Sequence, residues 1–228
     1  MADKSIGLIT YNCAHLKTEQ VALGLHQKKK YDLHLISLPF TPRPQRNVLF
    51  NHRPNQFKET LPLTELAEIT GASRHECLDE TKIPLGFDYY IVLIGVLLSG
   101  PLLSSQKVLN CHAGIIPLVR GLDAFKWTIL ENQPLGNTLH FIDEEVDAGE
   151  VIAVLPTTVK KSDTIEELAT RHYFNEIDAL CNFEKHMGAP SPSYAGAKPR
   201  EAHRRMPIEV ERKMLNSFET YKARHATS

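Results

Sequence analysis

The sequence has few cysteines, and their spacing does not indicate a metal site or a disulfide framework. The 228 residues include four, Cys13, Cys77, Cys111 and Cys181, and no two of them show the CxxC spacing that is typical of zinc sites and redox pairs. Scattered cysteines of this kind are usually small buried side chains in a reduced compartment. We therefore expect a cytoplasmic protein that binds no metal ion.

Long apolar runs and an excess of one charge are also missing. No run approaches the roughly 18 apolar residues that span a bilayer, and residues 1–15 lack the regions of a secretion signal. The 26 Lys and Arg residues nearly balance the 27 Asp and Glu residues, so the net charge is −1. Such a chain has no general attraction for nucleic acid or an anionic membrane. We therefore expect neither as a partner.

Apolar and polar segments alternate in the way that strands and helices do. We expect strands at 5–11, 33–38, 88–95, 107–110, 136–142 and 151–159. We expect helices at 18–29, 62–71, 124–131 and 164–187, the last with Asp163 as its N-cap and Gly188 as its stop. This order is typical of an α/β domain with a mostly parallel sheet flanked by helices. The domain is expected to cover residues 1–188.

Residues 189–228 form the expected C-terminal extension, with a helix at 208–224. Its basic stretch KPREAHRR, at 198–205, is followed closely by Glu209, Glu211 and Glu219. We therefore favour a helix that packs on the domain or forms a homodimer contact over an RNA-binding tail.

Prolines and basic side chains interrupt the pattern at residues 40–58. Arg43, Arg46 and Arg53 lie in this segment. Guanidinium groups pair well with phosphate oxygens, so these three are candidates to bind a substrate's diphosphate. A solvated surface loop is the alternative reading, and both stay open.

The clearest chemical signal is the stretch LNCHAGIIP at 109–117. A strand that ends here would place the amide of Asn110 and the imidazole of His112 at the carboxyl edge of the sheet, where open α/β folds bind ligands. The later stretch HFIDEEVDAGEVI places an acidic turn after another expected strand, and Asp147 is our candidate within it. An amide, a histidine and a carboxylate together serve acyl transfer. His140 is interpreted as a structural histidine of the core.

These two stretches resemble the core of the formyltetrahydrofolate-dependent formyltransferases over roughly residues 88–160. The resemblance implies a Rossmann-like formyltransferase fold and an enzyme that uses 10-formyltetrahydrofolate as co-substrate. It implies that Asn110 hydrogen-bonds the formyl oxygen and that His112 transfers a proton. It also implies that the Asp147 carboxylate pairs with His112. It also implies folate contacts from the loop after the strand at 88–95 and from the acidic turn, namely Gly95, Val96, Leu97, Leu98, Ile142, Asp143 and Val146.

The sequence departs from the family pattern at two places. Ala113 and Gly114 stand where the family has Pro-Ser, and TYNCAH after the first strand lacks the Gly-x-Gly-Ser-Asn phosphate cradle. The acceptor is therefore expected to be a small-molecule amine, an amino sugar linked to a nucleotide, rather than glycinamide ribonucleotide. The alternatives are a formyltetrahydrofolate hydrolase and a catalytically silent folate-binding module.

Overall fold

The computed structural model describes residues 3–42, 46–104, 107–188, 194, 197–198 and 200–227. The chain divides into two compact units, each made of separate stretches of sequence. Unit 1 contains Met1–Arg43, Asn55–Asn110 and Leu180–Asn182, and unit 2 contains Pro44–Pro54, Cys111–Ala179 and Phe183–Ser228. The expected boundary at residue 188 stays a prediction.

Unit 1 is built on a parallel sheet. Strand β1 (Lys4–Tyr11) pairs with β2 (Tyr31–Leu38) and with β4 (Tyr89–Val92), and β3 (Ser73–Glu76) pairs with β2. Strand β5 (Val108–His112) pairs with β4, and its last two residues belong to unit 2. Because all these ladders are parallel, the carboxyl ends of the strands lie at one edge of the sheet.

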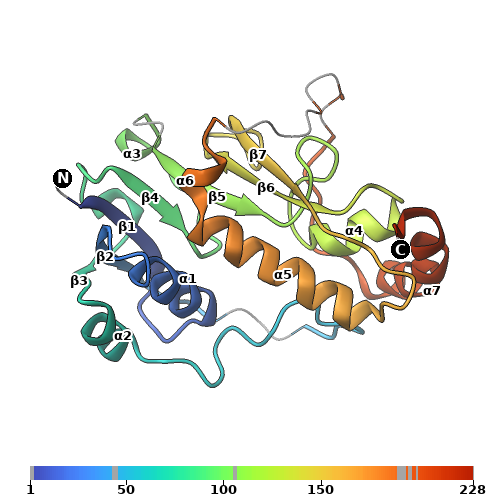
Figure 1. Ribbon diagram of the computed structural model, residues 1–228, viewed down its shortest axis with the longest axis horizontal. Coiled ribbons are helices and arrows are strands. Elements are labelled where there is room, and N and C mark those ends of the chain that lie inside the picture. Colours follow the sequence, from blue (N-terminus) through green and yellow to red (C-terminus); the bar gives the residue numbers. More distant parts are fainter. Residues whose placement is uncertain are drawn as a thin grey trace. The chain divides into compact units, whose positions relative to one another are not determined.

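Two helices of unit 1 follow β1 and β2 along the chain (Figure 1). Helix α1 (Leu16–His26) buries Val21, Ala22 and Leu25, and it contacts β1 and β2. Helix α2 (Leu63–Thr70) ends at Gly71, whose φ of 68° is the left-handed conformation that glycine adopts at no steric cost. The short α3 (Pro101–Ser104) and the 3-10 turn η1 (Glu80–Lys82) complete the helical segments described here.

Unit 2 contains an antiparallel strand pair and a helical core. Strand β6 (Gly136–Phe141) pairs with β7 (Val151–Pro156). The helices are α4 (Ala124–Leu130), α5 (Ile165–Cys181), α6 (Phe183–His186) and α7 (Ile208–His225). The last two residues of α5 belong to unit 1. Side chains of α4 and α7 share one buried cluster, which includes Phe125, Ile129, Met214, Phe218 and Tyr221, and the two helices lie side by side in Figure 1. Helix α7 thus buries its apolar side chains against α4.

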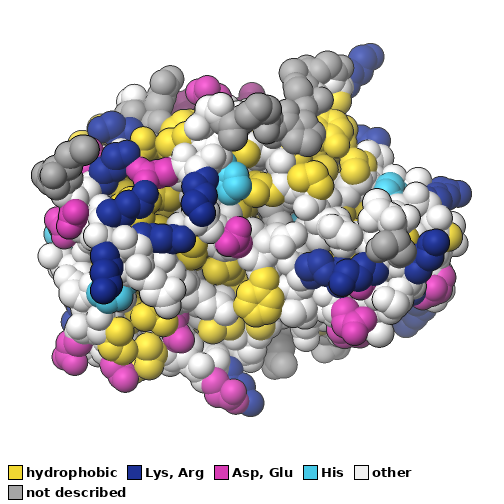
Figure 2. All heavy atoms as spheres, in the orientation of Figure 1, with side chains coloured by type: hydrophobic (Ala, Val, Ile, Leu, Met, Phe, Trp, Pro, Cys, Tyr) yellow, Lys and Arg dark blue, Asp and Glu magenta, His cyan; other side chains and the backbone are white. Residues whose placement is uncertain are grey.

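The ladder order of the strands is β3-β2-β1-β4-β5-β6-β7. This mostly parallel sheet with flanking helices confirms the expected fold class. The face in Figure 2 shows Lys and Arg side chains interspersed with acidic and apolar ones, as the balanced composition leads one to expect. Within the described residues, no helix has the length and apolar character needed to cross a membrane.

The expected helix at 164–187 differs from the structure in two respects. It is interrupted at Asn182, which separates α5 from α6. Its start is capped by Thr164 rather than Asp163: Glu167 N donates to Thr164 Oγ1 at 3.2 Å, and Thr164 N donates to Glu167 Oε2 at 2.9 Å. This reciprocal pair is a capping box. The Asp163 carboxylate instead accepts hydrogen bonds from Arg171 at 2.7 Å.

Candidate active site

His112 and Asp147 form a close pair in unit 2. Nδ1 of His112 lies 3.2 Å from Oδ2 of Asp147, and Nε2 lies 2.9 Å from the carbonyl oxygen of Val119. Both partners are oxygen atoms that accept hydrogen bonds, so each ring nitrogen faces an acceptor. With only 7% of the imidazole exposed, its orientation is fixed by these two contacts. The structure therefore brings together two of the three side chains proposed for catalysis.

The turn that carries Asp147 is held in an unusual backbone conformation. Asp147 has a φ of 48°, in the left-handed region that non-glycine residues rarely adopt. Its Oδ2 also accepts the backbone N–H of Gly121 at 2.8 Å. A Cβ at Gly149 would lie 1.9 Å from the carbonyl oxygen of Phe141, so only glycine allows the turn to pass this close to β6. The carboxylate is thus positioned by backbone contacts on both sides.

Arg120 joins the 119–121 segment to the acidic turn. Its Nε donates to the carbonyl oxygen of Val146 at 3.1 Å, and its Nη2 donates to the same oxygen at 2.5 Å. A planar guanidinium with two donors on one oxygen is a rigid link. The residues that contact His112 and those that carry Asp147 are therefore tied together independently of that pair.

Gly114 allows the close approach of His112 to Val119. A Cβ at residue 114 would lie 2.8 Å from His112 Nε2 and 2.7 Å from the Val119 carbonyl oxygen. Real Cβ atoms essentially never come this close, so a side chain here would displace the ring or the backbone. The departure from the family's serine at this position therefore has a steric reason in this chain.

His140, interpreted from sequence as a structural histidine, lies next to the pair. Its Nε2 is 3.9 Å from Asp147 Oδ1, and its Nδ1 is 3.1 Å from the carbonyl oxygen of Phe141. Burial, together with the neighbouring His112, lowers the pKa of His140 to about 4. His140 is therefore neutral at neutral pH. The family pattern itself, Thr-x-His before the acidic turn, was the signal that could have marked it.

Asn110 lies on β5, two positions before His112, and is half-buried. Side chains two apart on a strand point to the same face, so strand periodicity gives both residues the same orientation. Asn110 is the last residue of its stretch of unit 1.

The residues expected to contact folate follow β4 and β6. Gly95 N donates to the Tyr11 hydroxyl at 3.3 Å, and β4 ends earlier than expected, at Val92. Leu97 is 79% exposed and Val146 is 46% exposed. Val96, Leu98 and Ile142 are half-buried, and Asp143 is exposed. Exposed apolar side chains are available for contact with an aromatic ring, and the folate contacts of these positions stay a prediction.

The three arginines proposed to bind a diphosphate have different surroundings. Arg43 lies outside the described residues. Arg46 is exposed, and its Nη2 donates to the carbonyl oxygen of Met206 at 3.2 Å. Arg53 pairs with the buried carboxylate of Glu176 at 2.6 Å. A substrate phosphate on Arg53 would therefore compete with a carboxylate that has no access to water.

His172 is a second buried histidine of unit 2. Its Nδ1 lies 2.9 Å from Thr157 Oγ1, and its Nε2 lies 3.3 Å from the carbonyl oxygen of Ala113, next to His112 in sequence. Burial lowers the pKa of His172 to about 4. Within the described part of the chain, no group of three or more His, Cys, Asp or Glu side chains is arranged to hold a metal ion.

The segment that carries the histidine–aspartate pair is similar to known proteins. A family model described as "Formyl transferase" matches residues 71–183. Trifunctional purine biosynthetic protein adenosine-3 of Gallus gallus is 38% identical over 78 residues, which cover 33% of this chain and 8% of that protein. The chain thus spans only a small part of this relative's length.

Solved structures of other proteins have a fold similar to that of this chain. Phosphoribosylglycinamide formyltransferase from Anaplasma phagocytophilum is similar with a TM-score of 0.55 and 19% identity, over 80% of this chain and 86% of that one. A sugar N-formyltransferase from a Shewanella species is similar with a TM-score of 0.58 and 13% identity, over 94% of this chain and 87% of that one. At such identities the likeness shows the fold alone. Together with the family match, it confirms the resemblance to the formyltransferase family.

Proposed function

We propose that this protein transfers the formyl group of 10-formyltetrahydrofolate to the amine of an amino sugar that is linked to a nucleotide. The observation that carries the proposal is the contact between His112 and Asp147, within a segment that matches the formyl transferase family. A buried imidazole beside a carboxylate is suited to move a proton during acyl transfer.

The proposed reaction uses each of the three side chains once. The neutral amine attacks the formyl carbon, a C–N bond forms, and the carbonyl electrons move to the oxygen, where the amide of Asn110 donates a hydrogen bond. His112 takes up the proton that the amine loses on Nε2, which first leaves the Val119 carbonyl oxygen. It gives that proton to the folate nitrogen as the C–N bond to folate breaks and the C=O bond re-forms. Asp147 stabilises the positive charge of the imidazole ring at 3.2 Å.

The folate co-substrate supplies the activated formyl group when it is bound. Gly95, Val96, Leu97 and Leu98 after β4, and Ile142, Asp143 and Val146 after β6, are the residues proposed to hold its pterin ring. Leu97 and Val146 are each exposed, and this supports the assignment, because an aromatic ring that covers either side chain removes apolar surface from water.

The test is a formyl-transfer assay with 10-formyltetrahydrofolate and a panel of nucleotide-linked and free amino sugars. The variants are His112→Asn and Asp147→Asn, and His26→Asn, an exposed histidine at the end of α1, is the matched control. We expect His112→Asn to lower turnover by a factor on the order of 10² to 10⁴, with no effect of the control.

Other outcomes identify the alternatives. Release of formate without any amine, at the rate of full turnover, would make the protein a hydrolase of the formyl-folate. Tight binding of a folate analogue without transfer to any amine would make it a silent binding module. Transfer at the wild-type rate by both site variants would refute the proposed roles of the pair.

A further inference from the structure

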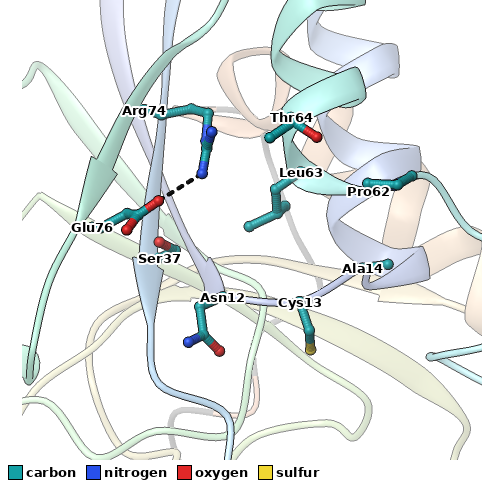
Figure 3. Close-up of a pocket in the computed structure, with 9 residues that line it drawn as sticks. All are labelled: Asn12, Cys13, Ala14, Ser37, Pro62, Leu63, Thr64, Arg74 and Glu76. Carbon is teal, nitrogen blue, oxygen red and sulfur yellow. Dashed lines mark hydrogen bonds and ion pairs between the residues drawn. The ribbon is translucent and has the colours of Figure 1, made fainter.

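Residues 117–123, a loop that leads into α4, supply backbone partners to both His112 and Asp147. The carbonyl oxygen of Val119 lies 2.9 Å from His112 Nε2, and the N–H of Gly121 donates to Asp147 Oδ2 at 2.8 Å. Loops run over the surface and are more mobile than the elements that they join. In unit 1, for example, the turn after β1 borders a cavity of about 320 Å³ (Figure 3). The geometry of the pair therefore depends on what holds the 117–123 loop in place.

A strap from the C-terminal extension, residues 200–206, pairs with this loop through its backbone. The N–H of His203 donates to the carbonyl oxygen of Arg120 at 2.9 Å, and the N–H of Leu122 donates to the carbonyl oxygen of His203 at 2.8 Å. Gly121, which these two bonds flank, has a φ of 88°, and a Cβ there would lie 2.6 Å from the backbone nitrogen of His203. Only glycine therefore allows the strap to lie this close to the loop.

The two ends of the strap are bonded to the loop as well. At the first residue, the N–H of Arg200 donates to the carbonyl oxygen of Pro117 at 3.4 Å, and the carbonyl oxygen of Arg200 accepts Nη1 of Arg120 at 3.2 Å. At the last residue, the N–H of Met206 donates to Asp123 Oδ2 at 2.9 Å. The loop is thus held at several points on both sides of the two groups that contact the pair.

Two side chains of α4 fix the strap to that helix. The His203 ring stacks on Trp127, with ring centroids 4.2 Å apart and ring planes 7° from parallel. Trp127 Nε1 donates to the carbonyl oxygen of Arg204 at 3.0 Å. The Glu131 carboxylate lies 3.0 Å from His203 Nε2 and 2.7 Å from Arg200 Nη1. His203 therefore joins the helix, through its side chain, to the loop, through its backbone.

We propose that the strap positions the His112–Asp147 pair for catalysis, and that His203 is the positioning residue that keeps the strap on the loop. The inference rests on the proposed function, which supplies the reaction that the pair carries out. It gives the C-terminal extension a role in the chemistry, in addition to the packing of α7 on α4.

The variant His203→Ala releases the strap and leaves every atom of His112 and Asp147 in the protein. It removes the stack on Trp127 and the contact with Glu131, so the loop loses part of its support. Because a misplacement of about 1 Å can lower turnover about 10²-fold, we expect kcat to fall by a factor of roughly 10 to 10². We expect a smaller effect on KM, since the variant removes no group that is proposed to bind substrate.

His225 on α7 gives the matched control. Its ring stacks on Tyr221, with ring centroids 4.3 Å apart, and its Nε2 lies 3.1 Å from Asn132 Oδ1. His225→Ala therefore also removes a histidine stack and a polar contact, but neither partner belongs to the 117–123 loop. We expect the two variants to lower the Tm by similar amounts and only His203→Ala to lower kcat. A purely structural role of His203 predicts the same kcat for both.

The imidazole ¹⁵N resonances of His112 test the positioning without catalysis. They are recorded by NMR on the full chain labelled with ¹⁵N-histidine, with no folate or amine present. The shift of a ring nitrogen depends on its protonation and hydrogen bonding, so we expect these resonances to move in His203→Ala and to stay at their wild-type positions in His225→Ala. Glu131→Gln, which leaves the stack intact, is the second variant, and it should move the same resonances by a smaller amount.

Two results would overturn the proposal. They are His112 resonances at their wild-type positions in both strap variants, and a kcat of folded His203→Ala equal to that of His225→Ala. If His203→Ala does not fold, Glu131→Gln decides by the same two measurements. Because the resonances need no substrate, the two proposals fail separately. Resonances that move only in the strap variants, in a protein that formylates no amine, support the strap and refute the proposed function. Formyl transfer by a protein in which neither kcat nor the resonances respond to the strap variants does the reverse.

Discussion

Adding a side chain at Gly114 should destabilise this protein, although the family pattern has serine at this position. A Cβ here would lie 2.7 Å from the Val119 carbonyl oxygen and 2.8 Å from His112 Nε2. The first contact is with backbone, which cannot rotate away, and the second is with a ring held at 3.2 Å from Asp147. Overpacking of this kind typically costs about 1 to 3 kcal/mol. We expect Gly114→Ala to lower the free energy of unfolding by an amount in this range, and Gly114→Ser to lower it by an amount at the upper end.

Urea unfolding at neutral pH measures this cost, and a double-mutant cycle assigns it. In a His112→Ala background the contact with the ring is gone, so Gly114→Ala should cost less there than in the wild type, by about 0.5 kcal/mol or more. The remaining cost comes from the Val119 carbonyl oxygen and from the Ala124 Cβ, which would lie 3.1 Å away. A Gly114→Ala protein as stable as the wild type would refute the steric reasoning. An equal cost in both backgrounds would refute the contribution of His112.

Three further predictions concern unit 2. Burial holds the pKa of His172 at about 4, below its ordinary 6.5, so the unfolded state takes up a proton first as pH falls. The free energy of unfolding should therefore drop between pH 6.5 and 4 by roughly 3 kcal/mol from this residue, and urea titrations should show a shallower drop for His172→Gln. Lys126→Met leaves the buried Glu211 carboxylate without its ammonium partner, and should cost about 3 to 5 kcal/mol by chemical unfolding. Thr164→Ala removes the cap of α5 and should cost about 1 kcal/mol; no loss in a thermal melt would argue against the capping box.

Much of the fold could be predicted because strands and helices with apolar faces leave a periodic pattern. β3 could not, since its sequence SRHE is polar and its side chains are exposed or half-buried at the edge of the sheet. The break at Asn182 was also missed, because the residues on either side, Cys181 and Phe183, are both buried and continue the apolar pattern. Periodicity reports burial, and it does not report where the backbone turns.

The candidate site also has features that the sequence predicts and features that it does not. Residue types and their order predicted the roles of His112 and Asp147, which the structure places in contact. The role of Val119 could not be predicted, because a backbone carbonyl oxygen carries no sequence signal. Arg53 was proposed to bind phosphate on the strength of its charge, but its partner Glu176 is far away in sequence. Pairings of this kind depend on tertiary structure.

The interleaving of the two units along the chain limits how this protein can change. Each unit is assembled from three separate stretches of sequence. No single genetic breakpoint, whether it fuses, truncates or exchanges a segment, separates one whole unit from the other. A lineage can therefore modify either unit residue by residue, but it cannot acquire or discard one in a single recombination event.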